Sequence, residues 1–160
     1  MTQIPTVTRR IEFDAAHRVA GHESKCGTIH GHRYVAEITA QASDLDNLGR
    51  VIDFSVLKEK VGGWIDTHWD HTSIIYHGSL KSSTCFFYYD DEPTLALLQQ
   101  APAWKHVWVA PWNPTAENMA HHLLHVICPM VLDGTGVKVV KVRLYETPNC
   151  WADCELKDHL

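Results

Sequence analysis

Three histidines lie at the adjoining ends of two stretches with alternating polarity, and this feature constrains the fold more than any other. Residues 6–17 end in His17, and residues 32–42 begin with His32, two positions after His30. On an extended strand, side chains two positions apart lie on the same face. If the two stretches pair as antiparallel strands, all three imidazoles converge at one end of the hairpin.

Such a group of imidazoles predicts a metal site. Three neutral histidines with a fourth position left open are typical of catalytic zinc, whereas structural zinc sites use four protein ligands and favour cysteine. We therefore predict that His17, His30 and His32 bind a metal, and the lack of a carboxylate in the set favours zinc over copper or iron. The alternative is three unrelated surface histidines in a hairpin loop.

Cys26 precedes this group in a polar loop that contains glycine. A free cysteine is often a small buried filler. Exposure and a nearby cation would instead lower the pKa of the thiol and make Cys26 a reactive thiolate. The pattern leaves open whether such a thiolate acts as a general base or as a nucleophile.

Two further places carry acid–base residues. Asp70 directly precedes His71 after a predicted helix, where it can orient or polarise the imidazole, although both can equally be solvated residues at a helix end. Glu146 closes a predicted strand, and a carboxylate there can hold two adjacent N–H groups of a ligand or be an ordinary strand-end charge.

The remaining histidines and cysteines give weaker signals. His121, His122 and His125 include a helical i, i+4 pair, but the glutamate that follows the first histidine in helical zinc motifs is missing. We interpret them as surface or interface residues. Cys150 and Cys154 could form half of a zinc site, but no second pair faces them.

Composition narrows the class of protein. With 160 residues, 45% hydrophobic and 21% charged, the chain is expected to form one domain, 1–160, of an ordinary globular protein. A net charge of −5 without a block of like charges gives no basis for binding nucleic acid or a membrane surface. Five cysteines without a disulfide spacing, and a start unlike a signal peptide, favour a cytoplasmic protein.

The expected fold class is α+β. Strands are predicted at residues 6–17, 32–42, 137–146 and 150–156, and helices from Asp53 or Ser55 to Ile65 and from Asn113-Pro114 to about Val131. This order predicts a four-stranded antiparallel sheet with the two helices on one face and a small insert between the helices. Within the insert, residues 72–76 and 84–89 suggest an extended pair, 91–100 a helix and 105–109 a short strand.

Six motifs in order resemble the family of 6-pyruvoyltetrahydropterin and 6-carboxytetrahydropterin synthases, over about residues 11 to 148. The motifs are Phe13-Asp14-Ala15-Ala16-His17-Arg18, Cys26 with His30-Gly31-His32, Val51-Ile52-Asp53-Phe54, Asp70-His71, Asn113-Pro114-Thr115-Ala116-Glu117-Asn118 and Tyr145-Glu146-Thr147. The resemblance implies a tunnelling fold, a lyase and a homohexamer with sites between subunits. The stretch 77–110 is longer than in the shortest members of the family and has no assigned role.

The resemblance also implies a role for each site residue. His17, His30 and His32 would bind the zinc that holds the side chain of 7,8-dihydroneopterin triphosphate. Cys26 would abstract a proton with His71 as its partner, and Asp70 would orient His71. Glu146 would anchor the pterin ring, with Thr115 nearby.

The spacing between Cys26 and His30 separates two branches of the family. Only three residues lie between them, which resembles the carboxytetrahydropterin branch. The implied products are 6-carboxytetrahydropterin, acetaldehyde and triphosphate, in a step toward 7-deazaguanine compounds such as queuosine. The alternatives are the pyruvoyl branch, an aldolase-like folate enzyme and a non-catalytic zinc-binding protein on the same scaffold.

Overall fold

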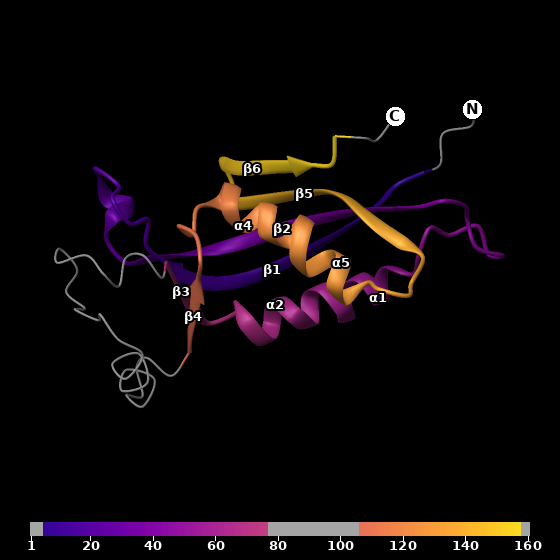
Figure 1. Ribbon diagram of the computed structural model, residues 1–160, viewed down its shortest axis with the longest axis horizontal. Coiled ribbons are helices and arrows are strands. Elements are labelled where there is room, and N and C mark those ends of the chain that lie inside the picture. The colour runs from indigo at the N-terminus through magenta and orange to yellow at the C-terminus, as the bar shows by residue number, and fades with distance from the viewer. Residues whose placement is uncertain (1–4, 77–105, 158–160) are drawn as a thin grey trace.

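Residues 5–76 and 106–157 are described by the computed structural model, which consists of a curled mixed sheet with helices on one face (Figure 1). The strands are β1 (Val7–His17), β2 (His30–Ala42), β3 (Thr72–Tyr76), β4 (Val107–Ala110), β5 (Val137–Thr147) and β6 (Cys150–Glu155). The helices are α1 (Phe54–Leu57), α2 (Gly63–His68), α4 (Ala116–His122) and α5 (Cys128–Val131). Within the described residues, no helix is both long and apolar enough to span a membrane.

The strand order in the described sheet is β4-β3-β1-β2-β5-β6. The α+β class and the long strands β1, β2 and β5 agree with the prediction, but the four-stranded antiparallel sheet is wrong. The sheet has six strands, because β3 pairs parallel to β1 and β4 pairs parallel to β3. Parallel strands need a long crossover connection. Between β1 and β3, this connection consists of β2 and the helices α1 and α2.

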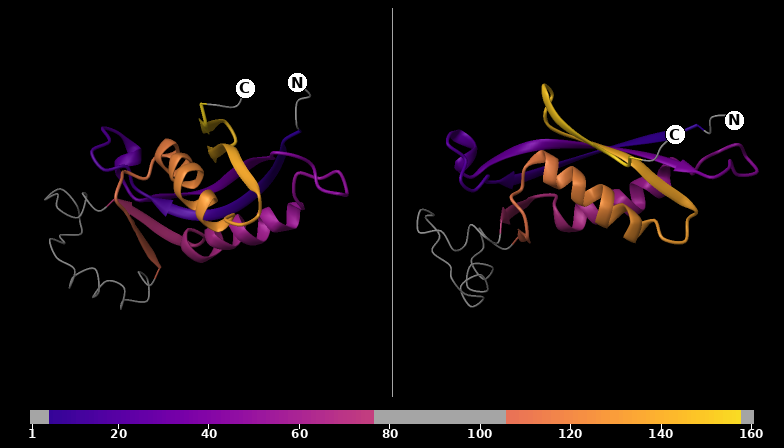
Figure 2. Two further views of the ribbon diagram at one scale, coloured as in Figure 1. Left: turned by 45° about the vertical axis from the view of Figure 1, so that its right-hand side comes forward. Right: turned by 45° about the horizontal axis from the view of Figure 1, so that its top comes forward.

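The two helical regions lie side by side on the same face of the sheet (Figure 2). Each is a short helix, a π-helical turn and a second short helix, the turns being Lys58–Gly62 and Leu123–Ile127. Asp53 caps α1 by accepting a hydrogen bond from the Ser55 amide at 2.8 Å, which confirms one of the two predicted caps. The second prediction is corrected: Thr115, not Asn113, is the N-cap of α4, and Pro114 precedes the helix.

The core lies between the helices and one face of the sheet. On β1 the odd-numbered side chains from Ile11 onward point inward, and on β2 the even-numbered ones do so. This alternation buries one apolar face of the hairpin and continues directly into the histidines at its end. The other predictions for the insert, residues 84–89 and 91–100, lie outside the described residues.

Candidate active site

The hairpin of β1 and β2 brings the three histidines together. His17 is paired directly with His30 in the register, and His32 is paired with Ala15. Gly31 separates the two β2 histidines, and a Cβ atom there would lie only 3.2 Å from the carbonyl oxygen of Ala15. One ring nitrogen from each histidine lies within 4.8 Å of the other two, and this is the one group of possible metal ligands of that kind in the described parts of the chain.

Backbone carbonyls fix the tautomers of two rings. His17 Nδ1 donates to the carbonyl oxygen of Pro114 at 2.6 Å, and His30 Nδ1 donates to that of Thr28 at 2.7 Å. A neutral imidazole carries one proton, so both Nε2 atoms present a lone pair. These Nε2 atoms face each other at 3.2 Å. Two lone pairs at that distance repel unless a cation or a proton lies between them.

More electron-rich atoms meet at the same point. His32 Nε2 is buried and has no hydrogen-bond partner among the described residues. The Oε1 atom of Glu146 lies 3.2 Å from His17 Nε2 and 3.8 Å from His32 Nε2. Ligand nitrogens of a tetrahedral zinc with Zn–N distances of about 2.0–2.1 Å are roughly 3.3 Å apart. The donor set therefore fits zinc, and metal-binding histidines commonly donate their other N–H to a backbone carbonyl, as His17 and His30 do.

Burial favours the neutral, metal-binding form of two of these imidazoles, those of His17 and His32. It lowers the pKa of His17 below the ordinary value of 6.5, although the Pro114 carbonyl and the Glu146 charge oppose the shift. Burial also lowers the pKa of His32, again against the charge of Glu146. No proton has to leave these two rings at neutral pH before a cation binds.

Glu146 lies beside the three histidines, at the point where the pairing of β5 with β6 becomes irregular. The register between β5 and β6 shifts between Tyr145 and Thr147, so Glu146 is the extra residue of a bulge. Leu144, two positions earlier, is fully buried, which places Glu146 on the inward face with it. The sequence pattern singled out this carboxylate as a candidate ligand-binding residue but gave no sign that it would contact the histidines.

Cys26 lies in a short 3-10 helix, Lys25–Gly27, whose surroundings hold it firmly. Its carbonyl oxygen accepts from the Val19 amide at 2.9 Å, and Arg18 Nε donates to the carbonyl oxygen of Gly27 at 2.6 Å. A Cβ atom on Gly27 would lie 2.8 Å from the backbone oxygen of His22, so only glycine fits there. The thiol is partly exposed, as a reactive cysteine must be.

Residues 113–115 contact three parts of the site: the loop that carries Cys26, the three-histidine group and the start of α4. The Asn113 side chain bonds to both backbone polar groups of Ala20, at 2.8 Å each, and so clamps the loop that carries Cys26. Pro114 orients His17, and the Thr115 hydroxyl accepts from the Asn118 amide at 3.3 Å. Sequence reasoning assigned Asn113 only as a helix cap and missed this clamp.

Asp70 and His71 form a separate pair in the loop after α2. His71 Nδ1 bonds to Asp70 Oδ2 at 2.7 Å, and Asp70 Oδ1 accepts from the Asp14 amide at 2.9 Å. The hydrogen bond with Asp70 raises the pKa of His71 above its ordinary value of 6.5. His71 has a φ of +53°, a strained conformation for a non-glycine residue that is often found at functional sites.

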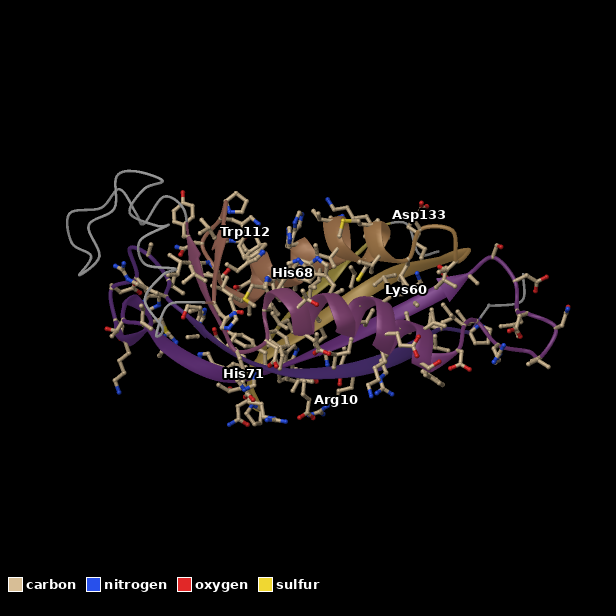
Figure 3. All side chains as sticks on the ribbon, turned by 90° about the horizontal axis from the view of Figure 1, so that it is seen from below. Arg10, Lys60, His68, His71, Trp112 and Asp133 are labelled. Atoms are coloured by element: carbon tan, nitrogen blue, oxygen red, sulfur yellow. The ribbon has the colours of Figure 1, made fainter. Side chains whose placement is uncertain are left out.

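His71 is open to solvent in the single chain, with 76% of its side chain exposed. In Figure 3 it lies with Arg10 along the strand side of the molecule, whereas His68 and Trp112 lie toward the helices. A hollow at this end of the sheet is lined by both His71 and His32. The structure thus brings the Asp70–His71 pair to the same end of the sheet as the three-histidine group.

The histidines of the second helical region are arranged differently. The rings of His121 and His125 contact each other at 4.3 Å, and His125 Nε2 lies 3.9 Å from Cys154 Sγ. His122 instead packs among tryptophans, with ring centroids 5.2 Å from Trp112 and 5.5 Å from Trp108.

Known proteins resemble this chain over most of its length. The model of the family described as 6-pyruvoyl tetrahydropterin synthase matches residues 6–157. Proteins named 6-carboxy-5,6,7,8-tetrahydropterin synthase from Rickettsia bellii and Rickettsia felis are 39% and 41% identical over 146 residues, which are 91% of this chain and 96% of each relative.

Solved structures share the fold. An uncharacterized protein from Wolinella succinogenes superposes with a TM-score of 0.73 at 23% identity, covering 98% of this chain and 100% of that one. The 6-pyruvoyl tetrahydropterin synthase of Caenorhabditis elegans superposes with a TM-score of 0.60, also at 23% identity and the same coverage. The match of the family model over residues 6–157 and the relatives of about 40% identity establish that the chain belongs to the 6-pyruvoyl tetrahydropterin synthase family.

Proposed function

We propose that this protein is a zinc-dependent 6-carboxy-5,6,7,8-tetrahydropterin synthase, a lyase formed by one domain, 1–160, that acts in the cytoplasm. It would convert 7,8-dihydroneopterin triphosphate to 6-carboxytetrahydropterin, acetaldehyde and triphosphate, in the synthesis of 7-deazaguanine compounds such as queuosine. The observation that carries the proposal is the pair of imidazoles, His17 and His30, whose Nδ1 atoms bond to backbone carbonyls and whose Nε2 atoms face each other at 3.2 Å.

His17, His30 and His32 would hold the zinc. A bound zinc ion would supply Lewis-acid polarisation of the substrate's side-chain hydroxyl groups, which makes the neighbouring C–H bond more acidic. Glu146 would bind the amino-pyrimidine edge of the pterin through two parallel hydrogen bonds, with Thr115 nearby. The close approach of Glu146 to His17 supports a substrate bound directly beside the metal group.

Cys26 would remove the proton from that carbon. Its loop is fixed by Asn113 and by Arg18, so the thiol keeps a constant position relative to the histidines. His71 would act as its acid–base partner. Asp70 would hold the proton on His71, because the raised pKa of this imidazole keeps it protonated closer to neutral pH.

The assembly would be a homohexamer with active sites between subunits. Two features support this: the exposure of His71 in the single chain, and the edge positions of β4 and β6, whose free backbone groups can pair with another chain. A neighbouring subunit would then cover His71 and exclude water. Native mass spectrometry of the purified protein tests the number of subunits.

Product analysis tests the reaction. The zinc-loaded protein is incubated with 7,8-dihydroneopterin triphosphate, and mass spectrometry is expected to detect 6-carboxytetrahydropterin together with acetaldehyde. The names of the Rickettsia relatives and the three residues between Cys26 and His30 favour this outcome. Accumulation of 6-pyruvoyltetrahydropterin without acetaldehyde would assign the chain to the pyruvoyl branch. No turnover, with zinc bound, would favour the non-catalytic alternative.

A further inference from the structure

Tyr34 continues the row of histidines on β2 into the core. It lies two positions after His32 on the inward face, and its side chain is fully buried. Its ring stacks on Phe13 at 5.2 Å and meets the rings of His17 and His32 edge-on at 5.7 and 5.5 Å. Its hydroxyl oxygen has no hydrogen-bond partner among the described residues.

A buried hydroxyl without a partner is destabilising, and most buried polar atoms in folded proteins are paired. Phenylalanine would fill the same space without that penalty, as Phe13 does on the neighbouring strand. The described residues leave the hydroxyl of Tyr34 without a partner, and a bound ligand can supply one.

The position of Tyr34 indicates where that partner lies. Val35 is paired with Tyr145 in the antiparallel register of β2 and β5, so the next inward-facing residues, Tyr34 and Glu146, lie across from each other. A phenolic O–H donates a hydrogen bond to a ligand oxygen without any change of charge. The side chain thus lies among the residues to which catalysis and pterin binding are assigned.

We propose that Tyr34 is a further substrate-binding residue, whose hydroxyl donates a hydrogen bond to a side-chain oxygen of a pterin bound at the three-histidine site. This inference rests on the proposed function and adds a contact to it. The bond would fix the substrate's side chain rather than its ring, because Glu146 holds the ring. It would thereby keep the carbon that loses its proton within reach of Cys26.

The test compares two ligands that differ only in their side chains. 7,8-Dihydroneopterin carries the side-chain hydroxyls without the triphosphate, and 6-methyl-7,8-dihydropterin has the same ring without those hydroxyls. Binding of each is titrated to zinc-loaded wild type and Tyr34→Phe. We expect the variant to bind 7,8-dihydroneopterin roughly 5- to 100-fold more weakly, as for a lost hydrogen bond in a buried site, and the methyl compound unchanged.

Two further measurements separate this role from a structural one. Tyr34→Phe should bind as much zinc as wild type, and its metal-free form should unfold at the same or a higher temperature, because an unpaired buried hydroxyl has been removed. Tyr145→Phe is the matched control, because its hydroxyl lies 3.5 Å from Arg143 and its ring packs against Trp151. The control should bind both pterins like wild type.

Equal binding of 7,8-dihydroneopterin by wild type and Tyr34→Phe would overturn the proposal. Loss of zinc, or equal weakening for both ligands, would overturn it too, because Tyr34 would then support the metal ligands or the ring site. If wild type binds neither pterin, the proposed function itself fails, and the inference about Tyr34 fails with it.

Discussion

The chain contains two groups of three histidines, and their different geometry shows what makes a metal site. His17, His30 and His32 come from two paired strands, where pairing across the hairpin and a spacing of two positions direct all three rings inward. The second group, 121, 122 and 125, lies on one helical region. Successive helical residues point about 100° apart, so His121 and His122 cannot face the same point.

The two groups also differ in what holds their rings. Carbonyl oxygens of Pro114 and Thr28 orient two rings of the strand group and leave their Nε2 lone pairs directed at each other. In the helical group, His125 lies beside His121 and Cys154, and His122 lies among indole rings. The two groups have the same number of imidazoles. Of the two, only the strand group directs ring nitrogens from all three histidines to one point, where a cation can bind.

The largest effect is expected from a substitution in the strand group, His17, His30 and His32. His30→Ala should reduce bound zinc from about one ion per chain to a trace and abolish turnover, because two imidazoles alone hold zinc weakly. The fold should persist, since His30 lies partly exposed at the start of β2. Elemental analysis and circular dichroism measure both. His121→Ala is the matched control and should keep zinc and activity; zinc retained in a triple variant of His17, His30 and His32 would refute the site.

A second, smaller effect concerns two thiols, that of Cys26 in the loop before β2 and that of Cys154 on β6. Cys26→Ala should keep zinc and lower turnover by about 10²–10⁴-fold, the usual loss when a positioned general base is removed. Cys154→Ala, beside His125, should leave turnover unchanged. Steady-state kinetics and metal analysis of both variants give the comparison. Near-normal activity without the Cys26 thiol would mean that another group removes the proton.

The sequence predicts much of this arrangement. It fails where pairing between segments far apart in the sequence determines the structure. Strict alternation and the histidine spacing determine β1, β2 and the convergence of the three rings. The parallel pairing of β3 and β4 was missed, because short apolar runs carry no information about which strand they join. The number of strands was therefore wrong even though most of the strands were correctly placed.

At the site, the failures have the same cause. Asn113 binds Ala20 across 93 positions of sequence, and a single sequence contains no signal for such a contact. Glu146 lies on the inward face of β5, but nothing in the pattern of that strand shows that it faces His17. By contrast, Asp70 and His71 are neighbours in the sequence, so their interaction could be predicted without knowledge of the fold. The structure contains the hydrogen bond between them.

A third prediction uses the pH dependence of turnover to compare His71 with the neutral histidines. Asp70 raises the pKa of His71, so the imidazolium persists to higher pH. If His71 acts as the acid, turnover falls as pH rises through this pKa. Asp70→Asn removes the cause of the shift and should move the alkaline limb of the kcat profile to lower pH. Asp153→Asn, which weakens the pairs of Asp153 with Arg143 and Lys141 away from His71, should leave the limb in place.

The smallest expected effect lies in the helical group. Burial lowers the pKa of His122 below 6.5, and the neighbouring His121 lowers it further. The unfolded chain therefore binds more protons than the folded one between the lowered pKa and 6.5, so the free energy of unfolding falls as pH drops through that window. His122→Gln should flatten this fall slightly without affecting zinc.

Tryptophan fluorescence reports the same titration directly, because a protonated imidazole quenches indole emission and the His122 ring centroid lies within 6.1 Å of those of Trp64, Trp69, Trp108 and Trp112. Wild type should lose emission as the pH falls through the lowered pKa of His122, while His122→Gln should not. His121→Gln keeps the buried ring and should retain most of the change. An unchanged titration in His122→Gln would mean that the indoles sense another group, and the description of His122 as a packed, non-ligating residue would then lose its main support.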